Sequence, residues 1–138
     1  MEQKQYSPRQ DKFTEARGGW STLLSIFCAR CKTEVLLYQK DGPGELKRMY
    51  LDKIIAPDAL ANKVATYSVI SGMNELSCPN CNSLMGIPMV YEKESRLAYQ
   101  VAEGGIIEKI NKKGRFPSAA GNILTKLINS IMIRFQSK

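Results

Sequence analysis

Four cysteines are the residues of this 138-residue chain best suited to chemistry, because they form two identically spaced pairs. The pairs are Cys28-Ala29-Arg30-Cys31 and Cys78-Pro79-Asn80-Cys81. A turn of this length lets two thiolates reach one ion at about 2.3 Å, and two such turns complete a tetrahedral four-sulfur site. The pattern predicts a structural Zn²⁺ ion bound by Cys28, Cys31, Cys78 and Cys81, with no open position for a substrate water.

Three other uses of the cysteines stay open. Iron in a rubredoxin-like site uses the same pairs and is the less favoured cofactor. A thioredoxin-like redox pair belongs at the start of a helix after a strand, whereas both pairs here lead into β-prone sequence. Disulfides are the third use. Because residues 1–10 lack the apolar segment of a secretory signal, we expect a reducing, cytoplasmic location in which thiols stay free.

The two pairs resemble the cysteine knuckles of the zinc-ribbon superfamily, in which each knuckle heads a β-hairpin and both clamp one zinc ion. The residues that carry the resemblance are Cys28-Ala29-Arg30-Cys31-Lys32 and Cys78-Pro79-Asn80-Cys81-Asn82. It covers residues 26–101 and implies knuckle-headed hairpins at 35–54 and 84–101. Zinc ribbons occur in many kinds of protein, so the resemblance is specific for a metal and says little about function.

Two features depart from the zinc-ribbon pattern. There are 46 residues between Cys31 and Cys78, against a common spacing of about 15–20, so extra structure must lie between the knuckles. Knuckles usually have glycine after the second cysteine, where the backbone favours positive φ. This chain has Lys32 and Asn82 there, and asparagine tolerates such a backbone more readily than lysine.

The elements that must position the cysteines are mostly β-strands. The turn Asp41-Gly42-Pro43-Gly44 predicts a hairpin between its flanking strands, and a short helix is expected over 59–66, after Pro57. Pro88 cannot donate to a ladder, so its strand is expected at an edge or a bulge. The predicted strands comprise residues 20–27, 35–40, 46–54, 67–70, 84–91, 97–101 and 106–110. The expected class is α+β, a β-rich zinc ribbon with a short inserted helix and a C-terminal amphipathic helix.

The length and composition fit a single domain with tails. Residues 1–19 are polar and end in two glycines, so we expect a flexible tail. The zinc-ribbon domain should span 20–110, and 111–138 should form a basic loop and a helix. Within 121–136 most apolar residues fall on one side of a helical projection. That helix is expected to pack on the protein or on a partner, with an anionic membrane surface or folding upon a partner as alternatives.

Basic charge is concentrated near the C-terminus. Of a formal net charge of +7, residues 104–138 contribute seven Lys/Arg against Glu108 alone. Such groups can neutralise phosphates while Tyr50 or Phe116 stacks on an unpaired base, although an ordinary solvated surface would have the same composition. The candidate nucleic-acid contacts are Lys109, Lys112, Lys113, Arg115 and Phe116, with a second patch of Arg30, Lys32, Lys47, Arg48 and Tyr50.

The chain contains no histidine, which removes the commonest general base and disfavours an enzyme. No run approaches the roughly 18 apolar residues of a transmembrane helix. The favoured hypothesis is a non-enzymatic zinc-binding module that binds nucleic acid, or a ribonucleoprotein or transcription assembly. The alternative is a zinc-stabilised module for protein interaction or self-association through residues 121–136.

Overall fold

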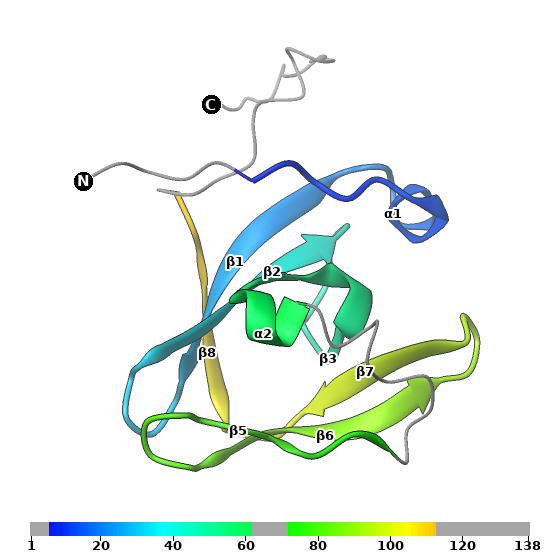
Figure 1. Cartoon of the computed structure of the whole chain (residues 1–138). Helices are drawn as coiled ribbons and strands as arrows, with labels where there is room; N and C mark the ends of the chain where they lie inside the picture. The colour runs from blue at the N-terminus through cyan, green and yellow to red at the C-terminus, as the bar shows by residue number, and fades with distance from the viewer. Residues whose placement is uncertain (1–5, 62–71, 113–138) are drawn as a thin grey trace. The chain divides into compact units, whose positions relative to one another are not determined.

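Antiparallel strands form two four-stranded sheets in this computed structural model, which describes residues 6–61 and 72–112. Sheet A has the strand order β4-β2-β1-β8 and sheet B the order β3-β7-β6-β5 (Figure 1). Both belong to one compact unit, Arg9–Asn111. The strands are β1 (Ser21–Cys28), β2 (Glu34–Asp41), β3 (Arg48–Tyr50), β4 (Ile54–Ala56), β5 (Leu76–Ser77), β6 (Leu84–Tyr91), β7 (Arg96–Val101) and β8 (Ile106–Ile110).

Helices are few and short in the described residues. They are α1 (Lys12–Ala16), the 3₁₀ turn η1 (Leu51–Lys53) and α2 (Asp58–Ala61). None of them combines the length and the hydropathy that a membrane crossing requires. The class is therefore β-rich α+β, as the sequence predicts.

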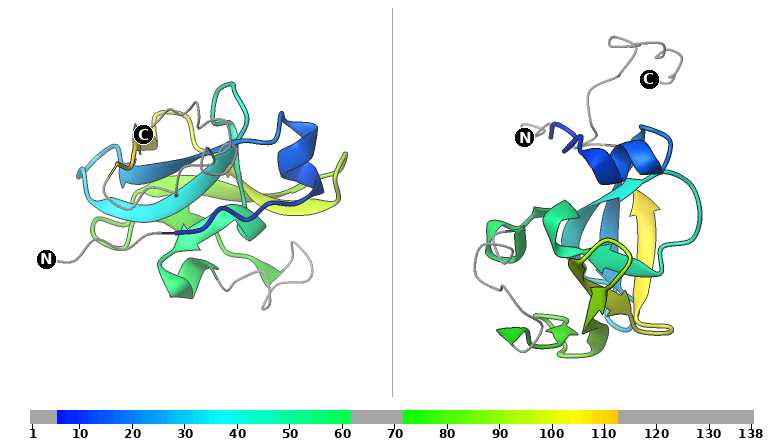
Figure 2. Two further views of the ribbon diagram at one scale, coloured as in Figure 1. Left: turned by 90° about the horizontal axis from the view of Figure 1, so that it is seen from above. Right: turned by 90° about the vertical axis from the view of Figure 1, so that its right-hand side faces the viewer.

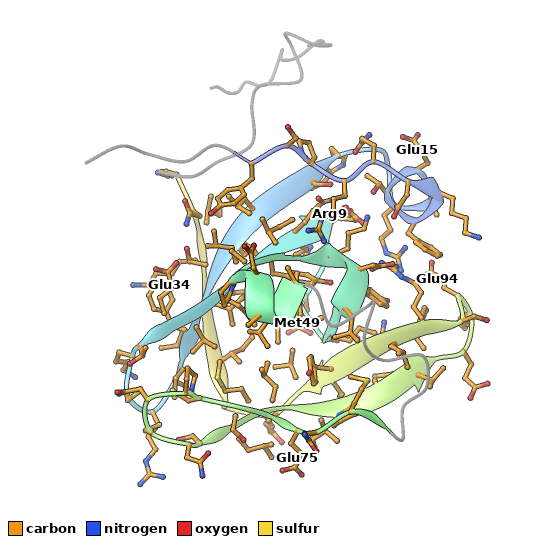
Figure 3. The ribbon with its side chains drawn as sticks, viewed as in Figure 1. Arg9, Glu15, Glu34, Met49, Glu75 and Glu94 are labelled. Carbon is orange, nitrogen blue, oxygen red and sulfur yellow. The ribbon has the colours of Figure 1, made fainter. Side chains whose placement is uncertain are left out.

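The core lies between the two sheets. Sheet A contributes Leu24, Ile26 and Leu36, each at most 4% exposed. Sheet B contributes Met49 and Tyr99, at 0% and 2%; Met49 is seen near the centre of the molecule in Figure 3. Each buried side chain of this size stabilises the fold by about 1.5–3 kcal/mol.

The cysteine pairs lie at the tips of two hairpins. The first pair joins β1 to β2, whose register runs from Ser21↔Asp41 to Phe27↔Glu34. The second pair joins β5 to β6. The two tips lie side by side in Figure 1 and in the left-hand view of Figure 2. Each knuckle therefore connects the two strands of a hairpin, one hairpin in each sheet.

The predicted hairpin over 35–54 is wrong. In sheet A, β2 pairs with β1 and β4, while β3 pairs with β7 in sheet B. The segment 46–54 is divided by η1, whose Leu51 is 1% exposed. The chain passes from sheet B to sheet A at η1, because β3 and β4 each bury apolar side chains in a different sheet. A local turn pattern does not reveal this change of sheet.

The predicted hairpin over 84–101 is confirmed. β6 and β7 pair from Gly86↔Val101 to Tyr91↔Arg96. Within the described residues, Pro88 pairs only with Tyr99, because β5 ends its pairing at Gly86. Pro88 thus lies at an edge, as its missing N–H requires. The predicted strand 106–110 is also present, as β8.

Residues 9–19 differ from the flexible tail that the sequence predicts for 1–19. The carboxylate of Asp11 caps α1 by accepting from the amides of Phe13 and Thr14, and a reciprocal Thr14 contact completes a capping box. Such a cap stabilises a helix by about 1 kcal/mol. Arg9 exchanges hydrogen bonds with the fully buried side chain of Gln39. This segment is part of the fold because its polar groups are satisfied by the sheets.

A buried lysine fastens α1 to sheet A. Lys53 is 1% exposed, and its Nζ lies 2.6 Å from Asp41 Oδ2 and 3.0 Å from Asp11 Oδ1. It also donates to Thr14 Oγ1 at 2.9 Å. Only 5% of the Asp41 side chain is exposed, so its buried carboxylate depends on Lys53 for neutralisation.

A buried arginine fastens α1 to sheet B. The Arg96 guanidinium lies between the rings of Phe13 and Tyr50, at 3.8 and 3.7 Å from their centroids. It forms ion pairs with Asp52 at 2.7 Å and Glu94 at 2.9 Å. Figure 3 shows Glu94 at the tip of the β6–β7 hairpin, facing α1. The sheets are thus joined at the knuckles and again through α1.

Several predictions fall outside the described residues. They are the strand at 67–70, the end of the helix predicted at 59–66, and the helix at 121–136. The beginning of the predicted 59–66 helix coincides with α2 (Asp58–Ala61).

Candidate metal centre

The four cysteines converge on one point although 46 residues separate the pairs. All four Sγ atoms lie within 4.8 Å of one another. Two contacts cross between the hairpins, Cys28 to Cys81 and Cys31 to Cys78, both at 3.6 Å. Four metal–sulfur bonds of about 2.3 Å in a tetrahedron place the sulfurs about 3.8 Å apart. The observed sulfur–sulfur distances therefore match the size of a metal site. All four cysteines are free of disulfides, so all four sulfurs are available as ligands.

The two knuckles have the same local geometry. In the first, the Lys32 amide donates to the Cys28 carbonyl at 2.8 Å, and the Cys28 amide donates to the Thr33 carbonyl at 2.9 Å. The second knuckle repeats both bonds at the same lengths with Asn82, Cys78 and Ser83. Lys32 and Asn82 both have φ of 67°, which confirms the expected positive φ after each second cysteine.

Polar side chains surround the sulfurs. The Thr33 hydroxyl lies 3.1 Å from Cys31 Sγ, and the Ser83 hydroxyl lies 2.9 Å from Cys81 Sγ. The Asn80 side-chain amide donates across to Cys31 Sγ at 3.4 Å. Sequence reasoning missed these three residues. The signal was present, since a hydroxyl residue follows each second cysteine by two positions.

The hydrogen bonds favour the thiolate in the first knuckle. Bonds from Asn80 and Thr33 lower the pKa of Cys31 to about 5. The backbone amide of Cys31 lowers the pKa of Cys28. Burial raises the pKa of Cys78. A bound cation offsets such a burial penalty, because a coordinating thiol is deprotonated outright.

The donor set suits a structural metal ion. Cys28 and Cys78 are 0% and 1% exposed, and the other two cysteines are half-buried. Among the described residues, the cluster consists of four sulfurs with no histidine or carboxylate. Four sulfur ligands complete a tetrahedral shell and leave no position for a reacting water. The arrangement is compatible with a fold-holding ion, for which zinc is the typical occupant.

The residues of the second predicted nucleic-acid patch come from both sheets, and one of them is buried. Arg30 and Lys32 are exposed in the first knuckle, on sheet A. Lys47 is exposed and Arg48 half-buried, at the start of β3 in sheet B. Tyr50 is 7% exposed and packs on Arg96, so its ring faces cannot stack on a base.

Only part of the first predicted patch is described. Lys109 is exposed on β8, where its Nζ lies 5.4 Å from the centroid of the Phe27 ring. Lys112 is also exposed. Lys113, Arg115 and Phe116 lie outside the described residues.

The fold and the site define a β-rich α+β protein with a four-cysteine cluster of metal-binding geometry. Comparison with known proteins does not narrow this class, because no family model, curated protein or solved structure matches the chain.

Asn80→Ala is expected to weaken metal binding about tenfold, because removing a group that orients a ligand typically costs about 10–100-fold in affinity. The measurement is zinc transfer to a chromophoric chelator at equilibrium. Asn74→Ala, at an exposed position outside the cluster, is the matched control and should bind as the natural chain does. Equal affinities for the two variants would contradict the role given to Asn80.

Proposed function

We propose that this protein is a non-enzymatic module in which a structural Zn²⁺ ion joins two hairpin tips, and that its basic surface binds nucleic acid. The convergence of four thiols within 4.8 Å is the observation that carries the proposal. Sulfur ligands select soft or borderline metals, and zinc is the ion that forms closed four-cysteine structural sites. Reduced thiols are required, so the proposal places the protein in the cytoplasm.

Exposed cations near the first knuckle support the nucleic-acid part of the proposal. The Ala29 amide donates to the Gly105 carbonyl at 3.1 Å, which holds the knuckle against the strand that carries Lys109. Arg30, Lys32 and Lys109 are all exposed, and none forms an ion pair with a described residue. Unpaired surface cations can neutralise phosphates and release counterions.

Binding of a mixed-sequence, single-stranded oligonucleotide is expected at low ionic strength and should weaken steeply with added salt. Each phosphate contact contributes about 0.7 to the slope of log K against log salt for single strands. Arg30→Gln and Lys109→Gln should each lower the slope by about that amount. Fluorescence anisotropy of a labelled oligonucleotide provides the measurement.

Lys93→Gln is the matched control, since Lys93 is exposed at the tip of the β6–β7 hairpin. It should leave the slope unchanged. Absence of binding at low salt, or an equal effect of all three variants, would refute nucleic-acid binding through this surface and leave the zinc site untouched.

A further inference from the structure

A small cleft lies at the start of β3, away from the cysteine cluster. It is formed by the end of β2, the connection 42–47, β3 and Arg17, and has a volume of about 190 Å³. Pockets for drug-sized ligands occupy about 300–1,000 Å³, whereas a water molecule takes about 30 Å³ of liquid. The cleft therefore suits a group larger than water and smaller than a drug-sized molecule.

The cleft has a surplus of positive charge. Two of its charged residues are already neutralised, because Arg17 pairs with Glu94 at 2.9 Å and Asp41 pairs with Lys53 at 2.6 Å. The remaining charged residues of the cleft are three cations and one carboxylate. They are Lys40, Lys47, Arg48 and Glu45, and none forms an ion pair with a described residue. The balance leaves two positive charges, which a dianion would neutralise.

The hydrogen-bond donors of the cleft are held in place. The Arg48 guanidinium lies 4.3 Å from the centroid of the Tyr91 ring and, within the described part of the chain, donates one hydrogen bond, to the Tyr50 hydroxyl at 3.3 Å. The other N–H groups of the planar Arg48 guanidinium remain to donate hydrogen bonds to an oxyanion.

Tyr50 adds a further donor. Its hydroxyl accepts from Arg17 at 3.2 Å as well as from Arg48, so both lone pairs are used and the O–H is left to donate. Among the described residues nothing accepts from it. Its position is fixed because the ring packs against Arg96.

We propose that this cleft binds a phosphate group, as inorganic phosphate or as a small phosphate monoester, through Lys47, Arg48 and Tyr50. Near neutral pH such a group carries up to two negative charges and several acceptor oxygens. It thus matches both the charge surplus and the donor set. This inference goes beyond nucleic-acid binding and does not rest on it, since the knuckle cations Arg30 and Lys32 take no part.

The test is a titration of the zinc-loaded full chain with inorganic phosphate in chloride buffer of constant ionic strength, followed by amide NMR shifts. The largest shifts should fall at residues 46–50 and saturate. Arg48→Gln should lower the affinity about tenfold or more, and Lys47→Gln and Tyr50→Phe should also lower it. A small phosphate monoester is then added to the phosphate-bound protein. Displacement of inorganic phosphate identifies a monoester as the ligand, and failure to displace it identifies the free ion.

Arg30→Gln is the matched control, because it removes an exposed arginine of the first knuckle. It should leave phosphate affinity unchanged. The proposal is overturned if Arg48→Gln, folded by its amide spectrum, binds phosphate as the natural chain does, if shifts occur only near residues 109–112, or if acetate displaces phosphate at equal concentration. Lys47→Gln keeps the test decisive should Arg48→Gln fail to fold, because Lys47 is exposed.

Discussion

Chelation of the metal is expected to abolish the cooperative folding of Arg9–Asn111. Zinc binding in isolated zinc-finger peptides is worth about 10–16 kcal/mol, whereas whole domains are stable by about 5–15 kcal/mol. Here the ion would join a hairpin of sheet A to one of sheet B, so its loss also removes the cation that stabilises partly buried thiolates at the junction. Thermal unfolding followed by circular dichroism before and after chelation measures the effect.

The control for chelation is re-addition of metal. Zinc should restore the cooperative transition, whereas Mg²⁺, which prefers oxygen ligands, should not. Cys78→Ser should reproduce the chelated state without any chelator, because Cys78 is a fully buried member of the cluster. An unchanged unfolding transition in both experiments would mean that the metal does not hold the sheets together.

Lys53→Met is expected to lower the free energy of unfolding by about 3–5 kcal/mol, the usual cost of removing one partner of a buried ion pair. The substitution keeps an unbranched chain that replaces the lysine methylenes but leaves the Asp41 carboxylate, 5% exposed, without its cation. Denaturant unfolding of the metal-loaded protein measures the loss. Lys93→Met, at an exposed hairpin tip, should change stability by no more than about 0.5 kcal/mol.

The pH dependence separates charge from packing at Lys53. Burial acts to raise the pKa of Asp41, but hydrogen bonds from Lys53, Gln39 and Ser21 outweigh it and hold the pKa below its ordinary value of 3.8. This stabilisation is fully present well above that value and is lost as the pH falls through the folded-state pKa. In Lys53→Met, protonation of Asp41 at acid pH removes the unpaired negative charge and so removes most of the cost of the substitution. The difference between Lys53→Met and the natural chain should therefore shrink towards acid pH, and a constant difference would indicate packing alone.

Short-range patterns predicted both knuckles and one of the two expected hairpins correctly. The paired cysteines predict their own convergence, and positive φ at Lys32 and Asn82 follows from the knuckle pattern. The hairpin over 84–101 was predictable because both strands and the connecting turn lie in one short segment. The knuckle turns and this hairpin depend on residues that are close in sequence, so their signals survive in a single chain. The convergence of the two knuckles follows instead from the need for four ligands around one ion.

The features that the sequence did not reveal depend on distant residues. Lys53 contacts Asp11 from 42 positions away, and Arg17 contacts Glu94 from 77. Without those partners, residues 9–17 look like a polar tail. Similarly, Tyr50 has the residue type of a base-stacking contact, yet Arg17 and Arg96 lie over its ring through contacts that no local pattern encodes.

X-ray absorption spectroscopy at the zinc edge, combined with metal analysis of the purified full chain, identifies the bound ion and its ligands. We expect one zinc ion per chain with four sulfur neighbours at about 2.3 Å. Iron in place of zinc, two sulfurs with nitrogen or oxygen ligands, or a metal-free protein that unfolds cooperatively would contradict it.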